Sequence, residues 1–283
     1  MDAQVIAAPA PAPIPISDGE LAAFLEVVFR TYHYDFRLYA AASLKRRLAV
    51  ALNHFGAPSV DGLARRIESD GFAFTQLLRF LTVQVSDLFR DPTYFRALRE
   101  TVVPYLSTYP SLKIWVAGCA TGEEAYSLAI LLEEEGLLDR ALIYATDIHP
   151  DSLRTAAEGI YDASRFTRFT ANYLAAGGKA SLSDYYMAHY SSALFDRRLR
   201  KSILFSDHSL ATDSAFAEMQ LVSCRNVLIY FDRELQNRAV GVLRDSLCHR
   251  GFLGLGNKES LRLTGHAAEF RDLVPEERIY QRL

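Results

Sequence analysis

From Ser17 to about Leu81, apolar residues recur every three or four positions, a spacing typical of amphipathic helices. The first helix is expected to begin at Ser17, with Glu20 at the spacing of a capping box. Residues 43–55 carry one apolar face, and the opposite face begins with three basic residues. The apolar positions are Leu44, Leu48, Ala51, Leu52 and Phe55. This pattern predicts a small all-helical domain.

After residue 91 the pattern changes, and short apolar runs alternate with helical stretches such as 123–134 and 150–160. The runs are typical of strands that are covered on both faces, and they lie at 113–119, 141–148, 203–210, 221–231 and 251–256. The alternation predicts an α/β fold with a doubly wound, mostly parallel sheet. The last six residues, 278–283, are expected to return antiparallel at the edge of the sheet.

The predicted domain boundaries follow these changes of pattern. Alternating Ala and Pro predict a disordered tail over residues 1–16. The helical domain is placed at 17–88 and the sheet domain at 89–283. The alternation is lost between Ser164 and Leu204, where Tyr and Arg are frequent, so an inserted subdomain is expected at about 181–205.

Charge and composition exclude several classes of protein. Net charge is −3, from 31 basic and 34 acidic residues among 283, which gives no overall field toward nucleic acid or anionic lipid. The three cysteines show no metal-ligand spacing, so neither a metal site nor a disulfide framework is expected, and a reducing compartment is favoured. No apolar stretch has the length of a membrane span, and the N-terminus lacks the features of a secretory signal. A cytoplasmic protein is therefore predicted.

A glycine turn follows the first predicted strand, in the stretch VAGCATGEEAYSLAI at 116–130. Gly118 and Gly122 precede a helix that is expected to begin near Glu123, at the carboxyl end of the strand, where such folds bind ligands. The spacing differs from the dinucleotide fingerprint, and Glu123 and Glu124 would repel a pyrophosphate at the helix N-terminus. A phosphate-free ligand fits better, although a purely structural turn is an equal alternative.

A second candidate follows the next predicted strand, which ends at Asp147. An acid at that position can accept hydrogen bonds from both hydroxyls of a ribose, or it can simply cap the next helix. Together with the glycine turn it suggests an adenosine-bearing ligand that is uncharged or cationic. S-adenosylmethionine is the leading candidate, because its sulfonium and amino group would be attracted to Glu123 or Glu124.

Six ordered segments then resemble one family, the chemotaxis receptor methyltransferases of the CheR type. They are LTVQVSDLFRDPTYF (81–95), IWVAGCATGEEAYSLA (114–129), YATDIHPDSL (144–153), AEGIYDASRF (157–166), VSCRNVLIYFD (222–232) and GFLGLGNKESL (251–261). The resemblance implies a Rossmann-like methyltransferase domain and transfer of a methyl group from S-adenosylmethionine to glutamate side chains of chemoreceptor helices. The products would be glutamyl methyl esters and S-adenosylhomocysteine.

The resemblance also implies roles for individual residues. Arg90 would close over the cofactor, and Glu124 and Asp147 would contact its amino group and ribose. Residues around the methyl group and the incoming carboxylate would be Arg225, Asn226 and Tyr230, with Arg225 expected to position rather than clamp the carboxylate.

Further positions in the resembling segments are implied to bind the cofactor, and some depart from the usual family residues. Gln84 stands where Asn is common, Ser86 where Thr is common, and Ser209, before Leu210, where Asn is usual.

Two surfaces are candidate partner sites. Lys45, Arg46 and Arg47 form either a solvated helix face or a basic surface that steers Glu-rich receptor helices. The insertion at 181–205 corresponds in position to a small β-subdomain, whose edge binds a receptor C-terminal peptide in some family members.

Two other functions stay open. A non-catalytic signalling adaptor would keep the cofactor fold as a sensor of S-adenosylmethionine or S-adenosylhomocysteine. A methyltransferase for a small carboxylic acid would leave the helical domain without a purpose. For a carboxylate acceptor the chemistry is simple, because glutamate is ionised at neutral pH and needs no general base.

Overall fold

The computed structural model describes residues 15–283, and the chain divides into two compact units between Leu81 and Thr82. Most of the predicted tail, residues 1–14, lies outside the described residues. Ile16, the last residue assigned to that tail, is buried just before the first helix.

The first unit is all-helical, as predicted. Its helices are α1 (Asp18–Tyr32), α2 (Ala41–Phe55), α3 (Val60–Ser69) and α4 (Gly71–Leu81). The capping box at the start of α1 is present, with Glu20 N donating to Ser17 Oγ at 3.2 Å and Ser17 N donating to a Glu20 carboxylate oxygen at 2.9 Å. The apolar face predicted for residues 43–55 is buried along α2. The core of this unit is formed by the apolar faces of amphipathic helices, and such faces give the periodic sequence pattern from which the helices are predicted.

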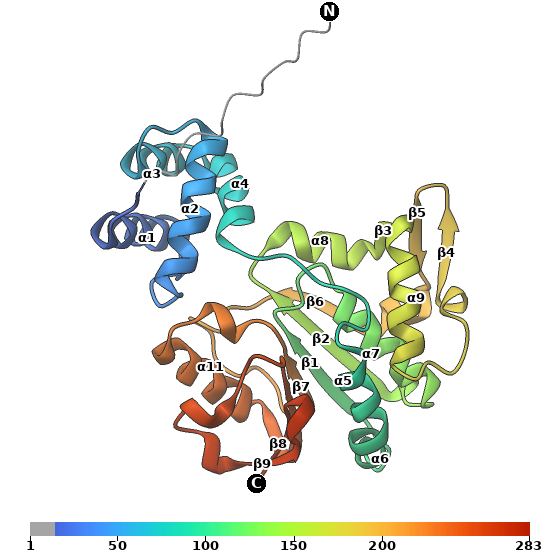
Figure 1. Ribbon diagram of the computed structural model, residues 1–283. Coiled ribbons are helices and arrows are strands. Elements are labelled where there is room, and N and C mark those ends of the chain that lie inside the picture. The colour runs from blue at the N-terminus through green and yellow to red at the C-terminus, as the bar shows by residue number, and fades with distance from the viewer. Residues whose placement is uncertain (1–14) are drawn as a thin grey trace, which may run out of the picture. The chain divides into compact units, whose positions relative to one another are not determined.

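The second unit contains a seven-stranded sheet in the order β6-β2-β1-β7-β8-β10-β9 (Figure 1). The strands are β1 (Leu112–Ala117), β2 (Ala141–Asp147), β6 (Ile203–Asp207), β7 (Met219–Cys224), β8 (Leu247–Leu255), β9 (Phe270–Val274) and β10 (Ile279–Arg282). The pairs from β6 to β8 are parallel, and β10 is antiparallel to β8 and to β9. The prediction that the C-terminus returns antiparallel is confirmed, but β9 and not β10 forms the edge. β9 is short and half-exposed, so it lacks the continuous apolar run from which the other strands are predicted.

Helices cover both faces of this sheet (Figure 1). They are α5 (Pro92–Ala97), α6 (Val103–Leu106), α7 (Glu123–Glu134), α8 (Pro150–Glu158), α9 (Phe166–Ala175), α10 (Arg197–Lys201) and α11 (Arg233–Asp245), with a π-helical stretch over Leu98–Val102. Ile114 and Val116 belong to the core cluster around α7, while Trp115 between them contacts Phe216 and His208 instead. This alternation is what a strand with two covered faces requires. Within residues 15–283, no helix is long and apolar enough to span a bilayer.

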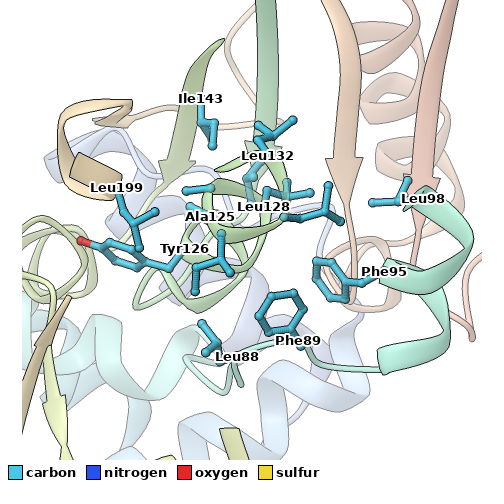
Figure 2. Close-up of a cluster of buried hydrophobic side chains, with 14 of the residues drawn as sticks. Leu88, Phe89, Phe95, Leu98, Ala125, Tyr126, Leu128, Leu132, Ile143 and Leu199 are labelled. Atoms are coloured by element: carbon cyan, nitrogen blue, oxygen red, sulfur yellow. The ribbon is translucent and has the colours of Figure 1, made fainter. Parts of the chain in front are cut away.

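The segment that precedes α5 belongs to the sheet unit. Leu88 and Phe89 are fully buried and join the cluster around α7 (Figure 2). Phe89 N donates to Ser127 Oγ of α7 at 2.7 Å. The domain boundary expected after residue 88 therefore falls inside this segment, and the units divide at the end of α4.

A second, three-stranded antiparallel sheet has the order β3-β5-β4, from β3 (Ile160–Asp162), β4 (Tyr186–His189) and β5 (Ser192–Phe195). The insertion expected at 181–205 covers β4, β5 and α10, but the extra sheet also recruits β3. Residues 203–205 already belong to β6 of the main sheet.

Candidate cofactor site

The glycine turn leaves β1 and enters α7 at Glu123. Gly118 and Gly122 have left-handed backbones, with φ of +75° and +94°. A Cβ on Gly118 would lie 2.3 Å from Val227 Cγ2, and a Cβ on Gly122 would lie 2.7 Å from Ala156 Cβ. Neighbouring protein atoms therefore leave no room for a Cβ at these two positions, so glycine is required there without any ligand.

Asp147 ends β2, and its side chain lies against this turn. One carboxylate oxygen accepts a hydrogen bond from Ala120 N at 2.8 Å, and the other accepts one from His149 N at 2.9 Å. The side chain of Gln84 is a third partner. Burial raises the pKa of Asp147 above its ordinary value, while these hydrogen bonds act in the opposite direction. The helix-capping alternative is wrong, since His149 is the N-cap of α8.

This corner of the sheet fits a ribose. A carboxylate has about four lone-pair positions, and those of Asp147 already accept from Ala120, His149 and Gln84, so about one further hydrogen bond can be accepted. Gln84 Oε1 is buried and, within residues 15–283, has no hydrogen-bond partner. Two neighbouring hydroxyl groups are donors of the kind that both acceptors require.

Glu123 and Glu124 lie side by side in sequence but in different environments. Glu123 is completely buried, and its carboxylate is bound by Thr121 Oγ1 and by Arg165 Nη1, which is 2.7 Å from Oε1. Glu124 accepts from Ser223 Oγ at 2.7 Å and from Arg225 Nη1 at 3.0 Å, and its side chain keeps 12% of its exposure. Of the two, only Glu124 has a surface that a cofactor amino group can reach.

Arg225 follows β7 and points into the protein, with its side chain 1% exposed. Its guanidinium binds Asp91 Oδ2 at 2.7 Å, Arg90 O at 3.0 Å and Glu124, and it lies over the ring of Tyr94 at 4.1 Å. Burial alone would lower the pKa of Arg225, but Glu124, Tyr94 and Asp91 outweigh this effect and raise it. Arg225 thus holds together the residues that border the site, and both of its terminal nitrogens are bound within the protein.

The loop after β7 is built on a buried glutamate. The carboxylate of Glu259 accepts hydrogen bonds from the backbone N–H groups of Asn226, Val227, Ile229 and Gly256, at 2.9, 2.8, 3.3 and 2.6 Å. Burial raises the pKa of Glu259, and the four hydrogen bonds counter it. Sequence reasoning gave Glu259 no role. The available signal was an acid three residues after the strand-like run GFLGLG.

Asn226 and Tyr230 are both placed by this loop. Asn226 has a left-handed backbone with φ of 61°, and Tyr230 ends the 3₁₀ turn Leu228–Tyr230, where it is half-buried. The strand predicted over 221–231 therefore stops at Cys224, because the buried carboxylate of Glu259 takes the following N–H groups that a strand would pair.

The remaining predicted residues lie on two segments. On the segment before α5, Arg90 is half-buried and its Nη1 donates to Val85 O at 3.1 Å, while the carbonyl of Ser86 accepts from Arg165 at 2.6 Å. After β6, Ser209 N donates to Asp213 at 2.9 Å and Leu210 is buried. Since β6, β2, β1 and β7 are parallel, their following loops meet at one edge of the sheet, where such folds bind ligands.

Comparison with known proteins identifies the family. Residues 84–275 match the family described as CheR methyltransferase, SAM binding domain, and residues 19–82 match the CheR methyltransferase all-alpha domain. This chain belongs to the CheR methyltransferase family. Its cofactor is S-adenosylmethionine.

Two relatives illustrate the extent of the CheR similarity. A protein of Pseudomonas putida named putative methyltransferase Cher3 is 51% identical over 94% of this chain and 97% of its own length. A chemotaxis protein methyltransferase of Listeria monocytogenes is 30% identical over 88% of this chain and 92% of its own length. Both comparisons include the helical unit as well as the sheet unit. The reaction of this CheR-family protein is therefore methylation that uses S-adenosylmethionine.

Proposed function

We propose that the protein methylates glutamate side chains of chemoreceptor cytoplasmic helices and forms glutamyl methyl esters. The observation that carries the proposal is the set of bonds already made by four carboxylates at the edge of the sheet where the loops after β1, β2 and β7 meet. Glu123 and Glu124 are bound by cations, Glu259 is bound by backbone N–H groups, and Asp147 is assigned to the ribose. None of these four is a ready general base, so an acceptor that arrives ionised is favoured over an amine or an alcohol.

In this proposal the protein aligns two reactants and excludes water. When bound, S-adenosylmethionine supplies an electrophilic methyl group. Asp147 accepts hydrogen bonds from the ribose hydroxyls, and Glu124 attracts the amino group. Arg225 fixes Glu124 and Asp91, whereas Arg90 and Tyr230 are the residues proposed to face the incoming carboxylate. Since Arg225 has its charge engaged inside the protein, Arg90 is the better cation for that role.

Receptor docking is proposed at two surfaces. In α2, Lys45 is 2.8 Å from Asp18, and Arg47 donates to Ser43 O and Leu81 O, whereas Arg46 is exposed. Arg46 is therefore the residue of this basic run that is proposed to steer Glu-rich receptor helices. In the extra sheet, β4 is an edge strand with Met187 exposed, and we propose it for strand addition by a receptor C-terminal peptide. Chemoreceptor helices of this kind place the reaction in the cytoplasm.

Tyr230→Phe tests the proposal, because it removes only a hydroxyl. We expect the single-turnover transfer of labelled methyl to a receptor fragment to slow by about tenfold, while affinity for S-adenosylhomocysteine changes little. Tyr105→Phe, at an exposed tyrosine of α6, is the matched control and should transfer at the parental rate. The label should be released by mild alkali, as an ester is.

Three results would contradict the proposal. A product stable to alkali would exclude carboxyl methylation. Tight binding of S-adenosylhomocysteine without transfer to any receptor fragment would favour the adaptor. An unchanged rate in Tyr230→Phe would remove Tyr230 from the site.

A further inference from the structure

Arg165 joins two parts of the cofactor edge that are far apart in sequence. It ends the 3₁₀ turn Ala163–Arg165 between β3 and α9. Its Nη1 is 2.7 Å from Glu123 Oε1, at the start of α7, and its Nη2 donates to Ser86 O at 2.6 Å, in the segment before α5. A guanidinium is suited to this task, because its planar fork offers donors in fixed directions.

On one side, Arg165 is the counter-ion of a buried charge. Glu123 has no exposed surface, and besides Arg165 its carboxylate is bound by the uncharged hydroxyl of Thr121. An ionised carboxylate in such a place requires a cation. Tyr161 of β3 supports the same turn by donating its hydroxyl to Thr121 O at 2.5 Å.

On the other side, Arg165 holds a segment whose backbone is strained. Phe89 and Asp91 have left-handed φ angles of 49° and 56°, and a bulky residue such as Phe pays for that conformation. The segment therefore needs fixed contacts, and Arg165 supplies one at Ser86. Gln84, whose side chain binds Asp147, and Arg90 lie on this same segment.

We propose that Arg165 is a positioning residue for the cofactor. By binding Glu123 and Ser86 together, it fixes the segment that carries Gln84 and Arg90 against the glycine turn, so that both side chains are in place when S-adenosylmethionine binds at Asp147. The inference rests on the cofactor site and not on the proposed glutamate acceptor.

The matched control for Arg165 lies one helical turn further on. Arg165 Nη2 lies 3.7 Å from Asp87 Oδ1, and Arg168 binds the same carboxylate at 2.6 Å, but the Arg168 side chain is 74% exposed. Arg165→Met should weaken S-adenosylhomocysteine binding by about tenfold or more in calorimetry, whereas Arg168→Met should stay within about twofold of the parent.

Loss of stability must be separated from loss of positioning. Arg165→Met leaves Glu123 charged and buried, so the double variant Arg165→Met/Glu123→Gln removes that charge as well. We expect the double variant to regain most of the parental melting temperature and yet to bind S-adenosylhomocysteine as weakly as the single variant. Arg165→Lys should also bind S-adenosylhomocysteine about as weakly as Arg165→Met does, because a single ammonium group cannot bind both Glu123 and Ser86 as the guanidinium does.

Hydrogen exchange gives a second readout. In the double variant, amides of residues 84–90 should exchange faster than in the parent, while amides of β1 and β7 should not. Parental affinity in the double variant would overturn the proposal and leave Arg165 as a charge partner alone. Equal losses in Arg165→Met and Arg168→Met would also overturn it. Because no methyl acceptor is present in these assays, a wrong glutamate assignment would leave their outcome unchanged.

Discussion

Two buried carboxylates at the same edge of the sheet differ in the hydrogen bonds that they already accept. Asp147 beside the turn after β1 and Glu259 beside the loop after β7 each bind the N–H of a residue with a left-handed backbone, Ala120 and Asn226 respectively. Asp147 accepts two backbone N–H groups and the side chain of Gln84, whereas Glu259 accepts four backbone N–H groups. Because a carboxylate has about four acceptor positions, Glu259 is saturated and Asp147 is not.

On this difference we propose that Glu259 is structural and that Asp147 binds the ligand. A saturated carboxylate fixes a loop, while one with spare lone pairs can also bind a ligand. Charge and burial alone do not distinguish the two, since both acids are buried and burial raises both pKa values. The two carboxylates are distinguished by the number of hydrogen-bond donors that each one already binds.

The largest expected effect is loss of stability on removing the saturated carboxylate. Glu259→Ala leaves four backbone donors without their acceptor, and each costs about 1–3 kcal/mol when buried. After partial hydration we expect the free energy of unfolding in urea to fall by at least about 3 kcal/mol. Lys258→Ala, at the exposed neighbour, should stay within about 0.5 kcal/mol of the parent. Equal stability of the two variants would mean that the loop after β7 does not depend on Glu259.

Removing Asp147 should instead act mainly on the cofactor. Hydrogen bonds to a charged acceptor are worth about 1.5–3 kcal/mol each, so Asp147→Ala should weaken S-adenosylhomocysteine binding by at least about tenfold. Calorimetry measures this change, and circular dichroism should remain parental. Its stability loss should be smaller than that of Glu259→Ala. Parental affinity would show that the ribose does not bind at Asp147, and the comparison between the two acids would fail.

The sequence predicted the parts of this edge that depend on local pattern. Continuous apolar runs located β1, β2 and β7, and the position of Asp147 at a strand end indicated its environment. Glu259 and Arg165 were not assigned roles, because their partners come from distant segments that only the fold brings together. The boundary predicted after residue 88 falls inside the segment before α5 for a related reason, since the short apolar run at Leu88 and Phe89 does not reveal which core it joins.

The smallest effect is expected at Gln84, which donates a hydrogen bond to Asp147 and whose Oε1 is the second acceptor that we propose for the ribose. Burial keeps the pKa of Asp147 above its ordinary value of 3.8, and the hydrogen bond from Gln84 opposes that rise. Gln84→Ala should therefore raise this pKa further and, near neutral pH, weaken S-adenosylhomocysteine binding by about fivefold for a loss of about 1 kcal/mol. Val85→Ala, at the exposed next residue, is the control.

The pH dependence of binding and of stability tests whether Gln84 lowers the pKa of Asp147. An ionised carboxylate accepts stronger hydrogen bonds from hydroxyl groups than a protonated carboxyl does, so affinity should fall as the pH decreases through the pKa of Asp147, and in Gln84→Ala the fall should begin at a higher pH. Stability of the free protein should change in the opposite sense. A carboxyl whose pKa is higher folded than unfolded binds its proton more tightly in the folded state, so its contribution is present at low pH and is lost as the pH rises from 3.8 through the folded value. Calorimetric titrations across this pH range check the change in affinity, and unfolding in urea at the same pH values checks the change in stability. Superimposable pH profiles for Gln84→Ala and the parent would show that Gln84 does not tune Asp147.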